Sequence, residues 1–135
     1  MITLDTSGIL AALNRGDPDH TRARKALKSE RGPLIVPVGI LAEAGYMIEM
    51  DLGAAVLRQF LADIVDGSFA LDCGESDMSR IVALLERYDD LRLGFADACV
   101  IACAERNGGR VLTFDERDFA PVAREGKISL VPLPH

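Results

Sequence analysis

The chain of 135 residues is long enough to bury one sizeable core, and we expect residues 1–135 to form a single domain. Its formal net charge of −6 argues against bulk electrostatic attraction to nucleic acid. The uncharged stretches are too short and too interrupted by Gly and Pro to span a bilayer, and the three cysteines suit a reducing compartment. We therefore expect a cytoplasmic protein without membrane contact.

Short apolar runs alternate with helical periodicity along the chain, which predicts an α/β fold with a parallel sheet. The expected element order is β-α-α-β-α-α-β-α-α-β-β. The expected strands are residues 1–5, 34–36, 68–73, 110–114 and 128–131. The expected helices are residues 7–14, 18–29, 37–50, 52–66, 75–87 and 95–107. In the second helix we expect Asp17 to be the cap and Pro18 the first helical residue.

Four carboxylates stand in otherwise apolar surroundings: Asp5, Glu43, Asp97 and Asp115. Asp5 and Asp115 each end a strand-like run, whereas Glu43 and Asp97 are lone charges within long uncharged stretches. An ionised carboxylate in apolar surroundings is costly unless something compensates its charge. If the four converge, a divalent cation that prefers oxygen ligands is the economical explanation.

Convergence is plausible because ligands gather beyond the carboxyl ends of parallel strands. Local explanations exist for three of the four. Asp5 could cap a helix, Asp97 could interact with a helix dipole, and Asp115 could cap the turn 115–118. Glu43 has no such role. The pattern as a whole therefore favours a metal site over four unrelated caps.

Other chemistries fit the residues less well. A catalytic triad needs a positioned histidine, and the chain has only two histidines. Cys99 and Cys103 lie one helical turn apart without histidine neighbours, so they are better explained as small core residues than as zinc ligands. Gly108-Gly109 is better explained as a helix stop than as part of a phosphate-binding loop.

The segments around the four acids resemble those of the PIN domain family, specifically the VapC-type toxins of toxin–antitoxin pairs. The matching segments are Ile2–Ser7, Pro37–Glu43, Leu93–Ala98 and Leu112–Phe119. Each is short, but their order and spacing together are specific. The resemblance implies a three-layer α/β/α fold with a central parallel sheet of four to five strands.

The resemblance also implies a function, a metal-dependent endoribonuclease that uses Mg²⁺ or Mn²⁺. Asp5, Glu43, Asp97 and Asp115 would be its catalytic and metal-binding acids. Thr6, Thr113 and Asp118 would support them. Toxins of this kind are homodimers that act on RNA and are inhibited by a cognate antitoxin protein.

Alternatives of other classes stay open on the sequence alone. They are a non-cleaving PIN scaffold that binds RNA or protein, and a metal-dependent DNA nuclease or phosphatase with the same acids. The basic run 15–31 is either a solvated helix or a phosphate-binding edge. In the second case its candidate RNA contacts are Arg15, Arg22, Arg24 and Lys25.

Overall fold

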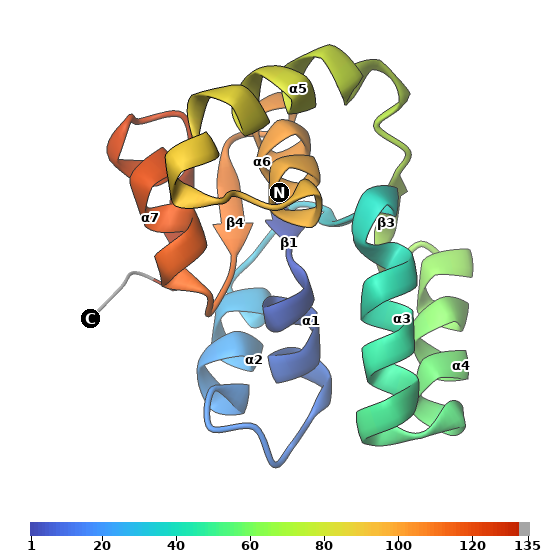
Figure 1. The fold of residues 1–135 in the computed structure, drawn as a ribbon. Coiled ribbons are helices and arrows are strands. Elements are labelled where there is room, and N and C mark those ends of the chain that lie inside the picture. The colour runs from blue at the N-terminus through green and yellow to red at the C-terminus, as the bar shows by residue number, and fades with distance from the viewer. Residues whose placement is uncertain (133–135) are drawn as a thin grey trace.

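The computed structural model describes residues 1–132, which contain an open sheet of five parallel strands (Figure 1). The strands are β1 (Ile2–Leu4), β2 (Leu34–Pro37), β3 (Ala70–Asp72), β4 (Arg110–Leu112) and β5 (Ser129–Val131). Their order across the sheet is β3-β2-β1-β4-β5, so β1 lies at the centre. The expected α/β fold with a parallel sheet is confirmed.

Seven helices within residues 1–132 flank this sheet. They are α1 (Thr6–Leu13), α2 (His20–Lys28), α3 (Val38–Leu52), α4 (Ala54–Val65), α5 (Met78–Arg87), α6 (Phe95–Arg106) and α7 (Glu116–Arg124). Single 3₁₀ turns at Glu75–Asp77 and Asp89–Leu91 precede α5 and α6. In Figure 1, α1 and α2 lie below the strands, α3 and α4 to the right, α5 above and α7 to the left. None of the helices in residues 1–132 is long and apolar enough to cross a membrane.

The hydrophobic core lies on the central strands and α6. All three residues of β1 are buried, as expected for a parallel strand that is covered by helices on both faces. Helix α6 is buried at every position from 98 to 104, including Cys99 and Cys103. These two cysteines are core residues, as the sequence indicated.

The strand order creates a topological switch point between β1 and β4, at the carboxyl ends of these strands. The chain leaves β1 towards β2 and leaves β4 towards β5, so two neighbouring parallel strands send their connections in opposite directions. In open parallel sheets such a switch point is where ligands bind, beyond the carboxyl ends of the strands. The residues that follow the two strands are Asp5 and Thr113.

One expected connection is wrong. Sequence reasoning joined the last two strands directly, whereas α7 lies between them. Residues 115–118 had the composition of a turn, and Pro121 lies inside the helix, where its missing N–H usually interrupts the hydrogen bonds. Helix α7 forms because Phe119 and Val122, three residues apart, are buried against the core.

Several boundaries also differ. Helix α2 begins at His20 instead of Pro18, because Asp17 organises a turn in which its Oδ1 accepts from the N–H of Asp19 at 2.8 Å. The expected helix 52–66 begins at Ala54, because Gly53 has a φ of +94° and ends α3. Strand β4 ends at Leu112, two residues before the expected end.

Gly8 provides a test of how α1 is placed on the sheet. A Cβ at this position would lie 2.5 Å from the carbonyl oxygen of Leu112, a backbone atom of β4. We expect Gly8→Ala to lower the free energy of unfolding by about 1–3 kcal/mol, because the helix must shift away from the strand. Gly45→Ala in α3 is the matched control, since its Cβ would meet nothing closer than Leu57 Cδ1 at 3.7 Å.

The control should be neutral or more stable by up to about 1 kcal/mol, because alanine favours helix over glycine. Urea unfolding of the three proteins measures both effects. A Gly8→Ala variant as stable as the wild type would show that α1 does not lie this close to β4.

Candidate active site

Asp5 is a buried carboxylate at the junction of β1 and α1. Its side chain is 6% exposed, and both of its oxygens accept hydrogen bonds. Oδ1 accepts from the backbone N–H of Gly8 at 2.7 Å, which caps α1, and from the hydroxyl of Ser7 at 2.8 Å. Oδ2 accepts from the hydroxyl of Thr113 at 2.5 Å. The capping role considered from sequence is therefore real, and it holds Asp5 in place.

The two hydroxyls that bind Asp5 also hold the segment after β4. Ser7 Oγ accepts from the N–H of Phe114 at 3.0 Å, and Thr113 Oγ1 accepts from the N–H of Asp115 at 2.9 Å. Ser7 thus positions two parts of the site, and sequence reasoning did not assign it. A hydroxyl two residues after the capping Asp was the available signal, but its partner lies 107 residues away.

Glu43 and Asp97 reach the same region from helices. Glu43 is exposed on α3, and its Oε1 accepts from the hydroxyl of Thr6 at 2.8 Å. Asp97 lies in the first turn of α6, where its Oδ2 accepts from the N–H of Gly94 at 3.3 Å. Asp97 therefore has the helix-start role considered from sequence and also faces the pocket described next.

One small pocket of about 70 Å³ collects the predicted acids. Its lining residues are Asp5, Thr6, Ser7, Ile40, Glu43, Ala96, Asp97, Val100 and Asp115. We call it the acidic pocket. Thr113 does not line it but binds Asp5 and the backbone of Asp115. Asp118 does not line it either, although its charge acts on both Asp97 and Asp115.

Burial and mutual repulsion disfavour ionisation in the acidic pocket. Burial raises the pKa of Asp5 to about 6, against the opposing effect of its three hydrogen bonds. Burial, followed by the charge of Asp118, raises the pKa of Asp97 to about 6, and burial also raises the pKa of Asp115. Within residues 1–132, none of the four pocket acids forms a salt bridge.

The donor set fits a hard divalent cation. It consists of carboxylate oxygens that form no salt bridge within residues 1–132, and carboxylate oxygens are the ligands that Mg²⁺ and Mn²⁺ prefer. Within residues 1–132, however, no three acidic, Cys or His side chains already converge closely enough to hold an ion. Binding would therefore require side chains such as Glu43 or Asp115, which are exposed, to turn towards Asp5 and Asp97.

The fold and the acidic pocket together define a class: an open parallel α/β protein with a carboxylate cluster at its topological switch point. The sequence profile described as "PIN domain" matches residues 2–125. The chain belongs to the PIN domain family.

The chain is also similar to individual known proteins. It is 28% identical over 134 residues to "Ribonuclease VapC26" of Mycobacterium tuberculosis, which covers 96% of this chain and 98% of that protein. Among solved structures, VapC20 of M. tuberculosis, described as a toxin that cleaves the sarcin–ricin loop, superposes with a TM-score of 0.79. It shares 22% identity over 90% of this chain and 95% of that one. FitAcB of Neisseria gonorrhoeae superposes with a TM-score of 0.68 and 20% identity over 96% of each chain.

The raised pKa of Asp5 gives the metal-free protein a defined pH dependence. Folding favours the protonated form, so this contribution to stability is complete below the unfolded pKa of about 3.8 and is lost as the pH rises through about 6. The full loss is about 3 kcal/mol at most, at roughly 1.4 kcal/mol per pKa unit. We expect Asp5→Asn to remove most of it and to be more stable than the wild type at pH 7.5 in EDTA by about 1–3 kcal/mol.

Denaturant unfolding between pH 4.5 and pH 8 measures this difference. Asp51→Asn, at an exposed position near the end of α3, is the control and should keep the slope of the wild type. Parallel curves for wild type and Asp5→Asn would contradict the raised pKa.

Proposed function

We propose that this protein, as one domain of 135 residues, is a metal-dependent endoribonuclease and the toxin of a toxin–antitoxin pair. The observation that carries the proposal is the acidic pocket, in which four carboxylates without counter-ions meet at the switch point of a PIN domain. PIN-domain ribonucleases are in general dependent on a divalent metal, and we propose Mg²⁺ or Mn²⁺ here. An RNA substrate would place the activity in the cytoplasm.

The side chains divide into two groups by burial. We propose Asp5 and Asp97, the less exposed pair, as direct ligands, with Glu43 and Asp115 completing the set directly or through water. A divalent cation held there would activate a water and offset the charge that develops on the scissile phosphate. Because Glu43 and Asp115 are exposed, they are also the pair that can orient an attacking water.

Hydroxyl groups position these acids. Thr6 holds Glu43, whereas Ser7 and Thr113 hold Asp5 and the backbone of the segment that bears Asp115. We propose Asp118 as an auxiliary acid, because its charge acts on Asp97 and Asp115 from the first turn of α7.

The similar proteins support RNA as the substrate. One is named a ribonuclease, and another is described as a toxin that cleaves the sarcin–ricin loop. A DNA nuclease or a phosphatase could use the same acids, and a PIN scaffold could bind RNA without cutting it. No contact in the acidic pocket favours these alternatives, and the uncompensated carboxylates have no evident use in a protein that only binds.

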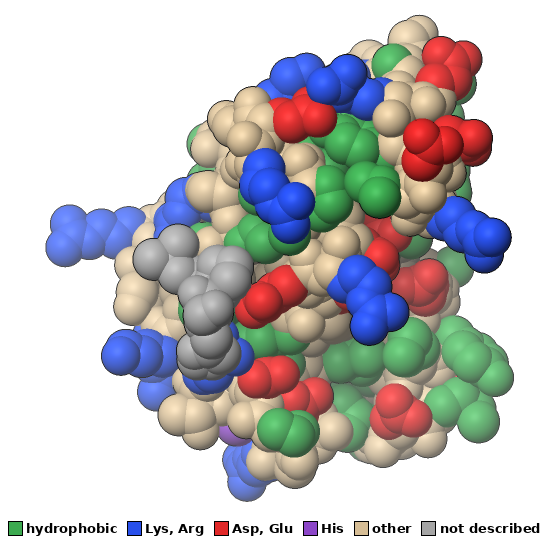
Figure 2. All heavy atoms as spheres, turned by 60° about the vertical axis from the view of Figure 1, so that its left-hand side comes forward, with side chains coloured by type: hydrophobic (Ala, Val, Ile, Leu, Met, Phe, Trp, Pro, Cys, Tyr) green, Lys and Arg blue, Asp and Glu red, His purple; other side chains and the backbone are tan. Residues whose placement is uncertain are grey.

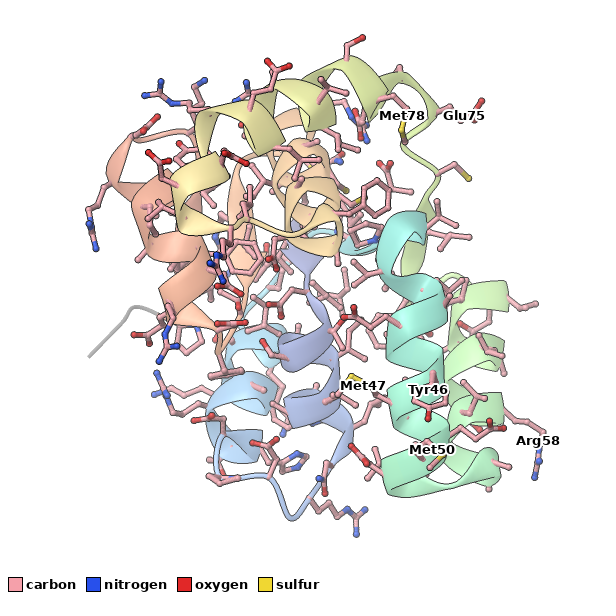
Figure 3. The ribbon with its side chains drawn as sticks, viewed as in Figure 1. Tyr46, Met47, Met50, Arg58, Glu75 and Met78 are labelled. Carbon is pink, nitrogen blue, oxygen red and sulfur yellow. The ribbon has the colours of Figure 1, made fainter. Side chains whose placement is uncertain are left out.

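Exposed apolar side chains support protein partners, for which we propose a second copy of the chain and an antitoxin. Val38, Met78 and Phe95 are each at least 40% exposed and border one hollow. Tyr46 and Met50 are about two-thirds exposed on α3, beside Met47, which faces α1 (Figure 3). Contiguous apolar patches of this kind mark protein interfaces.

Cleavage of a mixed RNA pool by the purified protein, without antitoxin, tests the nuclease. We expect cutting in Mg²⁺ or Mn²⁺, none in EDTA, and a rate at least about 100-fold lower for Asp5→Asn, because the variant loses a charged oxygen from the site. Asp66→Asn, the same substitution at a remote exposed position, should cut like the wild type.

Other results of the cleavage experiment would indicate a different function. Cutting of DNA but not RNA would indicate a DNA nuclease, and phosphate release from small esters would indicate a phosphatase. RNA binding without cutting by the metal-loaded protein would indicate a scaffold. Full activity of Asp5→Asn would contradict the assignment of the site.

Ser7 tests the positioning role of the hydroxyls. In Ser7→Ala, Asp5 loses one donor and the N–H of Phe114 loses its acceptor, so we expect kcat to fall by about 10- to 100-fold with little change in KM. Ser7→Thr keeps a hydroxyl and should recover much of the rate, and Ser68→Ala, at a remote exposed position, should have no effect. A Ser7→Ala variant with normal kcat would remove Ser7 from the positioning residues.

A further inference from the structure

Helix α2 carries an unbalanced positive charge. It holds four basic residues, Arg22, Arg24, Lys25 and Lys28, and no acidic one. The rest of the chain then has a net charge of −10. Among the salt bridges of residues 1–132, α2 contributes a single one, between Arg22 Nη1 and Asp19 Oδ1 at 3.1 Å. The charge on this helix is therefore largely uncompensated.

The charged helix borders a hollow of about 440 Å³ between α2 and the last two strands, which we call the basic groove. Arg22, Lys25 and Ser29 line it from α2 and the residue after it, and Arg110 lines it from β4. Arg110 Nη1 donates to the buried carboxylate of Glu30, which fixes the arginine in the wall of the groove. Val131 and Pro132 give the groove an apolar side.

The basic groove begins at the edge of the acidic pocket. The guanidinium carbon of Arg22 lies 5.3 Å from the centre of the Phe114 ring. Phe114 stands between Thr113, which holds Asp5, and Asp115, which lines the pocket. On the face drawn in Figure 2, acidic side chains lie in the middle and lower part as well as at the top, with Lys and Arg side chains among and beside them. A ligand that leaves the acids past Phe114 therefore meets Arg22 first.

We propose that the basic groove binds the phosphates of a single-stranded RNA next to the bond that is cleaved, an inference that rests on the proposed function. The acids repel a phosphodiester, and a fixed row of cations beside them supplies the attraction that brings the strand in. Arg22, Lys25 and Ser29 follow one another at intervals of three and four residues, so they lie on one side of the helix in a row about 10 Å long.

The residues that this proposal assigns to RNA binding differ from those expected from the sequence. It adds Arg110, which lies far along the chain from α2, and leaves out Arg15, which stands in the turn before α2 and is not among the residues that line the basic groove. Arg24 does not line the basic groove but an adjacent hollow with His20 and Lys28, and the two hollows share Lys25 and Ser29.

Two charge reversals provide the sharpest test. Lys25 and Arg58 are both exposed on helices, and Arg58 extends from α4 away from the rest of the molecule (Figure 3). Lys25→Glu and Arg58→Glu change the total charge equally, so any difference between them reports position. In an Asp5→Asn background that blocks cleavage, we expect Lys25→Glu to weaken binding of a fluorescent single-stranded RNA about tenfold. Arg58→Glu should have almost no effect.

The salt dependence gives a second readout. Arg22→Gln/Lys25→Gln should make the slope of log Kd against log salt shallower by about 1.4, since each phosphate contact with a single strand contributes about 0.7. Arg22 also packs on Phe114, so circular dichroism must show that this double variant folds. Lys25→Glu has no such contact to lose and keeps the test valid if the double variant does not fold.

The possible results of these experiments test the basic groove and the nuclease activity separately. Equal RNA affinity of Lys25→Glu and Arg58→Glu would overturn the basic groove, and wild-type cleavage would still establish the enzyme. A tenfold loss of RNA affinity in a protein that does not cut would support the groove and overturn the nuclease. If Lys25→Glu weakened binding of poly-glutamate but not of RNA, the groove would belong to an acidic peptide and the proposal would fail.

Discussion

The buried carboxylate of Asp5 links the ends of β1 and β4, the two strands between which the acidic pocket lies. It accepts from Gly8 at the start of α1 and from Thr113 after β4, so one side chain joins segments 108 residues apart. Because a buried acceptor left without a partner is costly, these hydrogen bonds make the buried Asp5 tolerable without a nearby cation. They also fix the neighbouring groups. The hydroxyl of Thr113 holds the backbone of Asp115, and Thr6, next to Asp5 in the chain, holds Glu43.

Asp77 is a buried acid outside the acidic pocket, and it differs from Asp5 in having a cationic partner. It is 5% exposed, about as buried as Asp5, and its two oxygens accept from Arg106 at 2.6 and 2.8 Å. Arg106 also binds Asp72 and so ties α6 to the end of β3. Among residues 1–132, no arginine or lysine pairs with Asp5 or Asp97 in this way. A cationic side chain there would stabilise the fold, but it would also occupy the place where a metal ion could bind.

Sequence reasoning found the acids because each one interrupts an apolar stretch, and that signal is local. It placed Asp5 and Asp115 at the ends of parallel strands and Glu43 and Asp97 in helices that could reach the same edge. The structure brings all four into one pocket. It could not find what depends on distant pairing. The link from Ser7 to Phe114 and the position of Arg110 beside α2 both need the strand order, which periodicity does not contain. Helix α7 was missed for the opposite reason, because the turn-like composition of residues 115–118 was outweighed by the burial of Phe119.

The distance in sequence between Asp5 and Thr113 also has a consequence during synthesis. While the chain is being made, Asp5, Glu43 and Asp97 emerge from the ribosome before the strand that completes their pocket. Strand β4 pairs with β1, and this pairing brings Thr113 and Asp115 to the acidic pocket. Thr113 and Asp115 both lie within the last quarter of the given sequence. If the proposed activity is correct, a nascent chain carries no finished nuclease while its own messenger is still being read. The order of the strands would then delay the appearance of toxicity until β4 has been made and has paired with β1.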